Sequence, residues 1–169
     1  VGPVGFETAI QPASEWISQT AAAAYQWRGV TYGNGLFVAV ANNAQNQGNT
    51  TRVMTSLDGE NWSLQNTPNS PWVSVAYGNG MFVAVSYGTT KAMSSPDGVN
   101  WTARNPGNST WTSVTYGDGK FVAVAQNGDV RAATSTDGIN WSSASVPALN
   151  EWYAVTYGNG LYVAVSRNG

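Results

Sequence analysis

The sequence contains no cysteine and no histidine. A disulfide, a zinc site built on cysteine or histidine, and a nucleophile activated by a histidine are therefore all excluded. Charge is also scarce: charged residues make up 9% of the chain, and the formal net charge is −2. The seven lysines and arginines are scattered along the chain and form no basic patch. Neither nucleic acid nor an anionic membrane is an expected partner.

Long apolar runs are missing as well. The longest run is far too short to cross a bilayer, so membrane insertion is not expected. No signal peptide is recognisable, and we interpret residues 1–5 as a linker or a processed end. The abundance of asparagine, glutamine, serine and threonine in place of charge favours an extracellular, cell-surface or virion location.

What the chain has is a repeat. Four copies share the pattern Trp-x-x-Val-x-Tyr-Gly-Asn-Gly-x-Phe-Val-Ala-Val, with Asp for Asn in the third copy and Tyr for Phe in the fourth. The copies span 27–40, 72–85, 111–124 and 152–165, so the tryptophans recur about every 40 residues. Asn-Gly and Asp-Gly are strong signals for tight hairpin turns. Each copy therefore predicts a β-hairpin, and the period is typical of a propeller blade.

A second pattern, Ser-x-Asp-Gly-x-Asn-Trp, follows the first three copies. It predicts a turn between two further strands, so that each repeat forms one four-stranded antiparallel blade. We interpret its aspartates and tryptophans as turn-forming and packing residues: Asp58, Trp62, Asp97, Trp101, Asp137 and Trp141. The leading tryptophans of the repeats are likewise expected to pack between blades.

The second pattern resembles the Asp-box of sialidase-like (BNR-repeat) propellers. The resemblance covers three turns, and the box is shortened here because no residue separates Asp from Gly. It implies a propeller fold and a structural turn on the face opposite the site of function. It implies no activity.

The two ends of the chain predict how the repeat closes. Residues 152–169 supply only an inner hairpin, and residues 6–19, around Trp16, look like a degenerate outer hairpin within a half blade at 6–26. We therefore expect one all-β propeller domain over 6–169, with whole blades at 27–71, 72–110 and 111–151. The two terminal halves would complete a fourth blade within one chain. Completion between two chains, or membership of a larger ring, is the alternative.

The loops between blades vary, whereas the hairpin turns nearly repeat. Function is usually carried by variable loops on a rigid scaffold. We therefore predict a ligand site on the face formed by the loops, drawn from amide, aromatic and charged side chains: Asn42, Asn43, Gln45, Asn46, Arg52, Tyr87, Lys91, Asn127, Asp129, Arg131, Glu151 and Arg167. Such a mixture suits a neutral, polyhydroxylated ligand.

These observations predict a non-enzymatic, lectin-like protein that binds glycans or adheres to a glycosylated surface, without a metal or cofactor. One carboxylate per turn is too few for calcium. A glycosidase using Asp129 and Glu151 as paired carboxylates is the weaker enzymatic alternative. The competing non-enzymatic reading is a structural module that forms homo-oligomers, such as a fibre, filament or capsid-decoration subunit.

Overall fold

In the computed structural model, residues 17–42, 50–89 and 91–168 are described. Within these ranges the chain forms strands, turns and loops, and no helix. The strands of the first two repeats are β1 (Trp27–Gly33), β2 (Leu36–Ala41), β3 (Val53–Ser56), β4 (Ser63–Gln65), β5 (Trp72–Gly78), β6 (Met81–Ser86), β7 (Ala92–Ser95) and β8 (Thr102–Arg104). Those of the last two are β9 (Ser109–Gly117), β10 (Lys120–Gly128), β11 (Ala132–Ser135), β12 (Ser142–Ala144), β13 (Trp152–Gly158) and β14 (Leu161–Ser166).

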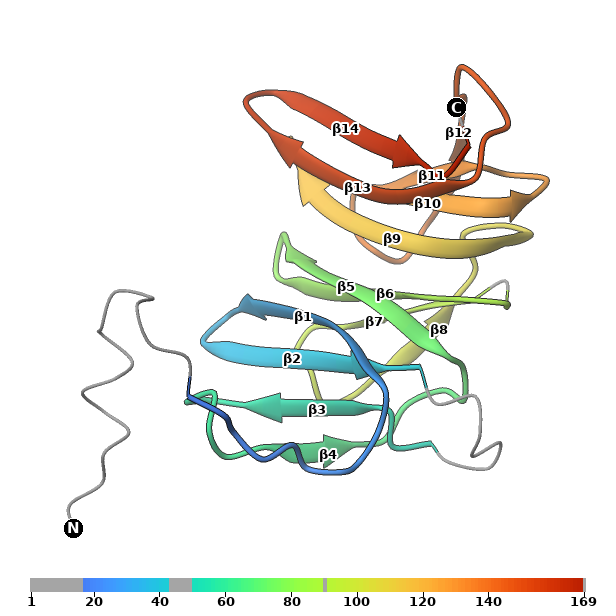
Figure 1. Cartoon of the computed structure of the whole chain (residues 1–169). Coiled ribbons are helices and arrows are strands. Elements are labelled where there is room, and N and C mark those ends of the chain that lie inside the picture. The colour runs from blue at the N-terminus through green and yellow to red at the C-terminus, as the bar shows by residue number, and fades with distance from the viewer. Residues whose placement is uncertain (1–16, 43–49, 90, 169) are drawn as a thin grey trace, which may run out of the picture.

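The strands form three antiparallel four-stranded sheets, β1–β4, β5–β8 and β9–β12, and one two-stranded sheet, β13–β14. The sheets follow one another in chain order, as Figure 1 shows from blue to red. The first strands of the repeats, β1, β5, β9 and β13, contact one another in sequence and form the inner edge. This arrangement confirms an all-β fold built like a propeller. The number of blades and the closure of a ring stay predictions.

The inner hairpins turn where the sequence predicts. The second residue of each Gly-Asn-Gly or Gly-Asp-Gly segment has a positive φ between 43° and 49°, and the glycine after it has φ between 73° and 80°. Two consecutive residues in the left-handed region match the twist of the strands that they join. Asparagine, aspartate and glycine are the residues that adopt this conformation at least cost.

Valines fill the space between successive sheets. Val38, Val40 and Val53 of the first sheet pack against Trp72 and Met93 of the second, all fully buried. The same arrangement recurs between the second and third sheets around Trp111. Between the third sheet and the β13–β14 hairpin it recurs around Val122, Val124 and Val155. Each of the three four-stranded sheets thus presents a ridge of valines to the sheet that follows it in the chain.

A glycine at the end of each inner strand receives the tyrosine of the next sheet. A β-carbon on Gly33 would lie 2.1 Å from Cγ of Tyr77, and one on Gly78 would lie 2.0 Å from Cγ of Tyr116. On Gly117 it would lie 2.0 Å from Cγ of Tyr157. The tyrosine rings leave no room for a residue larger than glycine at the ends of β1, β5 and β9, which explains why glycine precedes the hairpin turn in the first three repeats.

The turns between the two outer strands are held by aspartate. In the third sheet, the Asp137 carboxylate accepts bonds from Asn140 N–H (2.8 Å), Ile139 N–H (2.8 Å), Asn140 Nδ2 (2.8 Å) and Ser135 Oγ (3.0 Å). Asp58 and Asp97 accept the equivalent bonds in the first and second sheets. Hydrogen bonds from the backbone of Asn140 and Ile139 and from the Asn140 side chain hold the pKa of Asp137 well below its usual range.

The three turn aspartates predict a loss of stability in acid. Their pKa values are lowered in the folded protein, and an unfolded aspartate titrates at about 3.9. Their contribution is therefore complete above about pH 4 and is lost as the pH falls toward the folded pKa. Thermal unfolding from pH 7 to pH 2 should show a steeper fall below pH 4 in the wild type than in the combined variant Asp58→Asn, Asp97→Asn and Asp137→Asn. If the melting temperatures of the wild type and the variant fell in parallel with pH, this role of the aspartates would be contradicted.

The predicted N-terminal outer hairpin falls mainly on residues 6–16, outside the described part of the chain. Residues 17–26 are described and contain no strand. They instead precede β1 as a loop: Gln26 accepts a 2.9 Å bond from Asn42 N–H, and Ala23 accepts a 3.1 Å bond from Trp27 Nε1. Residues 20–26 thus take the place of the loop that enters the first strand of each repeat, and the half blade over residues 6–26 stays a prediction.

Candidate functional site

Every repeat carries a β-bulge one residue after its leading tryptophan. In the first sheet, Trp27 pairs with Ala41 and Gly29 pairs with Val40, which leaves Arg28 between them without a partner in the ladder. The equivalent residues of the other repeats are Val73, Thr112 and Tyr153. A bulge redirects the side chain of its extra residue and bends the strand. The same irregularity therefore occurs at one level in all four inner strands.

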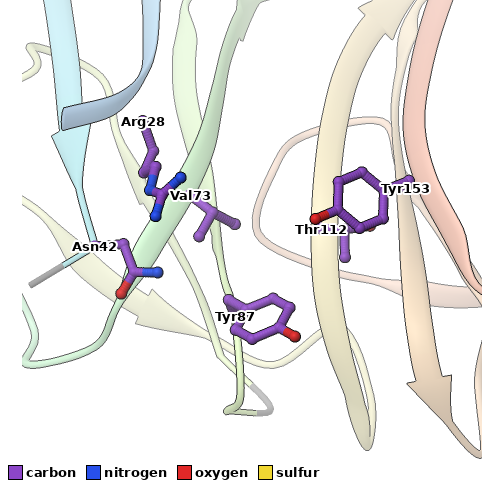
Figure 2. Close-up of a pocket in the computed structure, with 6 residues that line it drawn as sticks. All are labelled: Arg28, Asn42, Val73, Tyr87, Thr112 and Tyr153. Carbon is purple, nitrogen blue, oxygen red and sulfur yellow. The ribbon is translucent and has the colours of Figure 1, made fainter. Parts of the chain in front are cut away.

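The four bulged residues line one depression. With Asn42 and Tyr87, which directly follow β2 and β6, they enclose a volume of about 260 Å³. Figure 2 shows Arg28, Asn42, Val73 and Tyr87 on one side of this space and Thr112 and Tyr153 on the other. The depression lies at the end of the inner strands from which the variable loops extend. Its lining thus comes from all four repeats.

A second repeated position contributes to the rim. Asn42 and Tyr87 are each held by a backbone bond of 2.9 Å, from Asn42 N–H to Gln26 and from Tyr87 N–H to Pro71. Arg167 N–H makes the same bond, also of 2.9 Å, to Glu151. Arg167 therefore corresponds to Asn42 and Tyr87. Arg52 and Arg131 lie at a different position of the repeat, because they directly precede the third strand of their sheets.

The side chains of the pocket combine charge, hydrogen-bonding groups and aromatic rings. Arg28 is exposed, and Tyr87 and Tyr153 are 39% and 55% exposed. The Tyr87 hydroxyl lies 3.4 Å from Oε1 of Gln126. The Thr112 hydroxyl instead serves the fold, because it lies 2.8 Å from the Trp152 carbonyl oxygen of the neighbouring hairpin. Arg28, Asn42 and the two tyrosines are therefore the side chains of the pocket that are available to contact a ligand.

The predicted arginines of the loops are engaged in the scaffold. Arg52 is only 3% exposed, its carbonyl accepts a 3.0 Å bond from Ala41 N–H, and burial lowers the pKa of its guanidinium. The Arg131 guanidinium donates to the Gln126 carbonyl. The structure does not bring either side chain into the pocket. Lys91 occupies the position equivalent to Arg52 and is exposed.

The other predicted residues lie elsewhere or are not described. Asn127 and Asp129 line a separate, shallow depression of about 220 Å³ beside Thr89 and Asn108. Glu151 is half-buried, and its N–H donates a 2.9 Å bond to Asn168 Oδ1. Asn43, Gln45 and Asn46 fall outside the described residues. Of the twelve predicted site residues, Asn42 and Tyr87 line the central pocket.

Sequence reasoning missed Arg28, Val73, Thr112 and Tyr153 because they stand inside the repeated unit, which was assigned to the scaffold. A signal was nevertheless present. The position after the tryptophan holds four chemically different residues, whereas the tryptophan, valine and tyrosine around it are the same in every copy. Such chemical variation beside constant packing residues indicates a side chain that the fold does not need.

The described residues contain no cluster of three or more acidic side chains that could hold a metal ion. No helix long and apolar enough to span a membrane occurs among residues 17–42, 50–89 and 91–168.

Comparison with known proteins gives similarity in structure only. No protein-family model matches the chain. No curated protein matches it in sequence. A catalytically inactive histidine-to-alanine variant of virginiamycin B lyase from Staphylococcus aureus, solved with Quinupristin, is 15% identical with a TM-score of 0.67, over 79% of this chain and 46% of the lyase. YCF48 from Cyanidioschyzon merolae is 16% identical with a TM-score of 0.61, over 85% and 50% of the two chains.

The chain thus spans about half the length of the lyase and of YCF48. The computationally designed Ika4 protein is instead matched nearly from end to end: the alignment covers 89% of this chain and 94% of Ika4, at 12% identity and a TM-score of 0.64. These likenesses confirm the propeller-like fold. They also overturn the sequence-based prediction that the chain is not an enzyme, because the structures that share its fold include a lyase.

Proposed function

We propose that the central pocket binds a carbohydrate, and that the protein attaches through it to glycans. The observation that carries the proposal is the convergence of Arg28, Asn42, Tyr87 and Tyr153 on one open depression. These side chains come from three different repeats. Arg28 and Tyr153 stand at β-bulges, and Asn42 and Tyr87 directly follow β2 and β6. A secreted, cell-surface or virion location belongs to the same proposal.

The chemistry of the lining supports this ligand class. The Asn42 amide both donates and accepts hydrogen bonds, as a sugar hydroxyl requires. The tyrosines present ring faces that pack against the C–H face of a pyranose, while their hydroxyls stay available for bonding. Arg28 adds a fixed positive charge, which would favour a sugar that carries a carboxylate or sulfate. A pocket of about 260 Å³ accommodates a unit of small-ligand size.

A glycan array tests the proposal directly. The protein is labelled at its amino terminus and screened against neutral and acidic glycans, and every glycan that binds is then titrated in solution. The proposal expects at least one sugar with a dissociation constant in the micromolar to millimolar range. The absence of binding to any glycan at protein concentrations near 1 mM would remove it.

Variants of the pocket tyrosines should weaken binding without affecting folding. Tyr153→Ala removes an aromatic face that is 55% exposed, and we expect about a tenfold loss of affinity for a sugar found on the array. Thermal unfolding should change little, because an exposed side chain contributes little to packing. Asp129→Asn, in the separate depression, is the matched control and should bind as the wild type does. Equal losses in both variants would assign binding to another surface.

A further inference from the structure

The two ends of the stack of sheets leave apolar side chains uncovered. At the last hairpin, Leu161, Val163 and Val165 of β14 are 63%, 55% and 57% exposed. Val38 and Val40, at the corresponding positions of β2, are completely buried against the second sheet. The two strands have nearly the same sequence, Leu-Tyr-Val-Ala-Val in β14 and Leu-Phe-Val-Ala-Val in β2. The valine ridge of β14 therefore lacks, among the described residues, the sheet that every other ridge packs against.

The first sheet has an open groove of the kind that receives a valine ridge elsewhere in the protein. This mostly apolar groove of about 360 Å³ is lined by Trp27, Val30, Ala39, Met54 and Trp62, together with Arg28 and Gly29. The equivalent residues of the second sheet, including Trp72, Val75, Ala84 and Met93, receive the valine ridge of the first sheet. Val30 is 63% exposed, whereas the equivalent Val75, Val114 and Val155 are 8%, 5% and 9% exposed. The groove is thus a receiving surface of the kind that the interior of the protein uses three times.

The glycines before the hairpin turns also differ between the interior and the end of the stack of sheets. Gly33, Gly78 and Gly117 each receive a tyrosine ring, but a β-carbon on Gly158 would meet no atom within 4 Å. At the other end, Tyr32 is 58% exposed, and none of the described glycines receives its ring. One end of the chain therefore holds an empty glycine position, and the other end holds the tyrosine that fits it.

We propose that a second copy of this chain covers both end faces, with β14 of each copy packed into the β1–β3 groove of the other. The joint reproduces the packing between neighbouring sheets: Val163 and Val165 enter the groove, and Tyr32 of one copy lies over Gly158 of the other. Two copies related by a two-fold axis form two identical joints and close a ring. The matched residues span 46% of the lyase chain and 50% of the YCF48 chain, so the matched parts of two copies equal about one such chain.

A ring of two copies also completes the ligand pocket. Its lining residues occur once per repeat at the inner edge, so the second copy contributes a further Arg28, Tyr87 and Tyr153 around the same axis. The burial of apolar surface drives the association, since the exposed side chains are valine, leucine, tyrosine and tryptophan. The proposal stands on the end faces and does not depend on the identity of the ligand.

Sedimentation equilibrium of the full-length protein between 1 and 200 μM measures the assembly. The expected mass of the wild type is about twice 17.8 kDa. Val163→Lys places a charge in the joint, and Gly158→Val fills the position of the Tyr32 ring; both should sediment as single copies. Gly158→Val disturbs no contact within one copy, because its surroundings are open. The control Val99→Lys lies in the β7–β8 turn, is comparably exposed at 43%, and should keep the doubled mass.

Circular dichroism and thermal unfolding establish that the variants are folded. A wild-type protein that sediments as one copy up to 200 μM would overturn the proposal, and would show that the end faces are covered within the chain or by a different protein. A mass well above two copies would replace the closed ring with an open assembly. A doubled mass that survives both Val163→Lys and Gly158→Val would show that the copies associate through another surface.

Discussion

Replacement of Gly78 by alanine is expected to lower the free energy of unfolding by about 3 kcal/mol. The new β-carbon would lie 2.0 Å from Cγ of Tyr116 and 2.2 Å from its Cδ1. Cγ is the ring atom nearest the backbone, so the ring cannot swing aside without a shift of the β9 strand. Tyr116 also packs edge-on against Phe121, with ring centroids 4.8 Å apart, and this contact would be disturbed as well.

Gly158→Ala is the matched control, because the same substitution at the equivalent position meets no atom within 4 Å. Both variants are made in the Val163→Lys background, where association between copies cannot contribute. Chemical denaturation then compares the two free energies of unfolding. Gly158→Ala should be neutral or slightly stabilising, since alanine restricts the unfolded chain. A loss of less than about 1 kcal/mol for Gly78→Ala would contradict the packing of tyrosine on glycine between sheets.

Replacement of Trp111 by alanine is expected to cost about 4 kcal/mol of stability. Trp111 is completely buried between the second and third sheets, where it packs in a cluster with Val83, Val85 and Phe121. Its indole N–H also lies 3.4 Å from the Gly107 carbonyl oxygen. The substitution leaves a cavity at the centre of the stack that the surrounding strands cannot close.

Trp152→Ala should cost clearly less than Trp111→Ala. Trp152 has the same place in its repeat and a similar indole bond, 3.3 Å to the Ala148 carbonyl oxygen, but it is only partly buried against the third sheet. Denaturation midpoints and slopes for both variants measure the difference. Equal losses would mean that burial between complete sheets does not determine the contribution of these tryptophans.

The fold could be predicted from the sequence because the same turn and strand signals recur in four copies of the repeat. Asn-Gly and Asp-Gly turns, valine-rich strands and Asp-Gly-x-Asn turns each have a direct physical cause, and the strands lie where these signals place them. The N-terminal stretch was harder. Trp16 has the spacing of a blade tryptophan, but residues 12–15 lack the Asp-Gly of the other copies, and the described residues 17–26 form a loop held to Asn42.

The candidate site was only partly predictable. Asn42 and Tyr87 were found because they begin variable loops. Arg28 and Tyr153 were not, because a β-bulge cannot be read from residues that also fit a regular strand. Arg52 misled for the opposite reason: it stands in a variable loop, yet its side chain is buried beside β3. Variability between repeats identifies candidate positions, but a site residue must also point its side chain into the pocket. Only the structure shows where each side chain points.

The central claim is that the bulged residues and their neighbours form the ligand site. The most direct test is two-dimensional ¹H–¹⁵N NMR of the ¹⁵N-labelled protein during titration with the sugar that binds with the highest affinity on the array. The largest chemical-shift changes should map to the backbone of Arg28, Asn42, Tyr87 and Tyr153 and to the Arg28 side chain. Shifts centred on the β3–β4, β7–β8 and β11–β12 turns, or on the depression around Asp129, would contradict it.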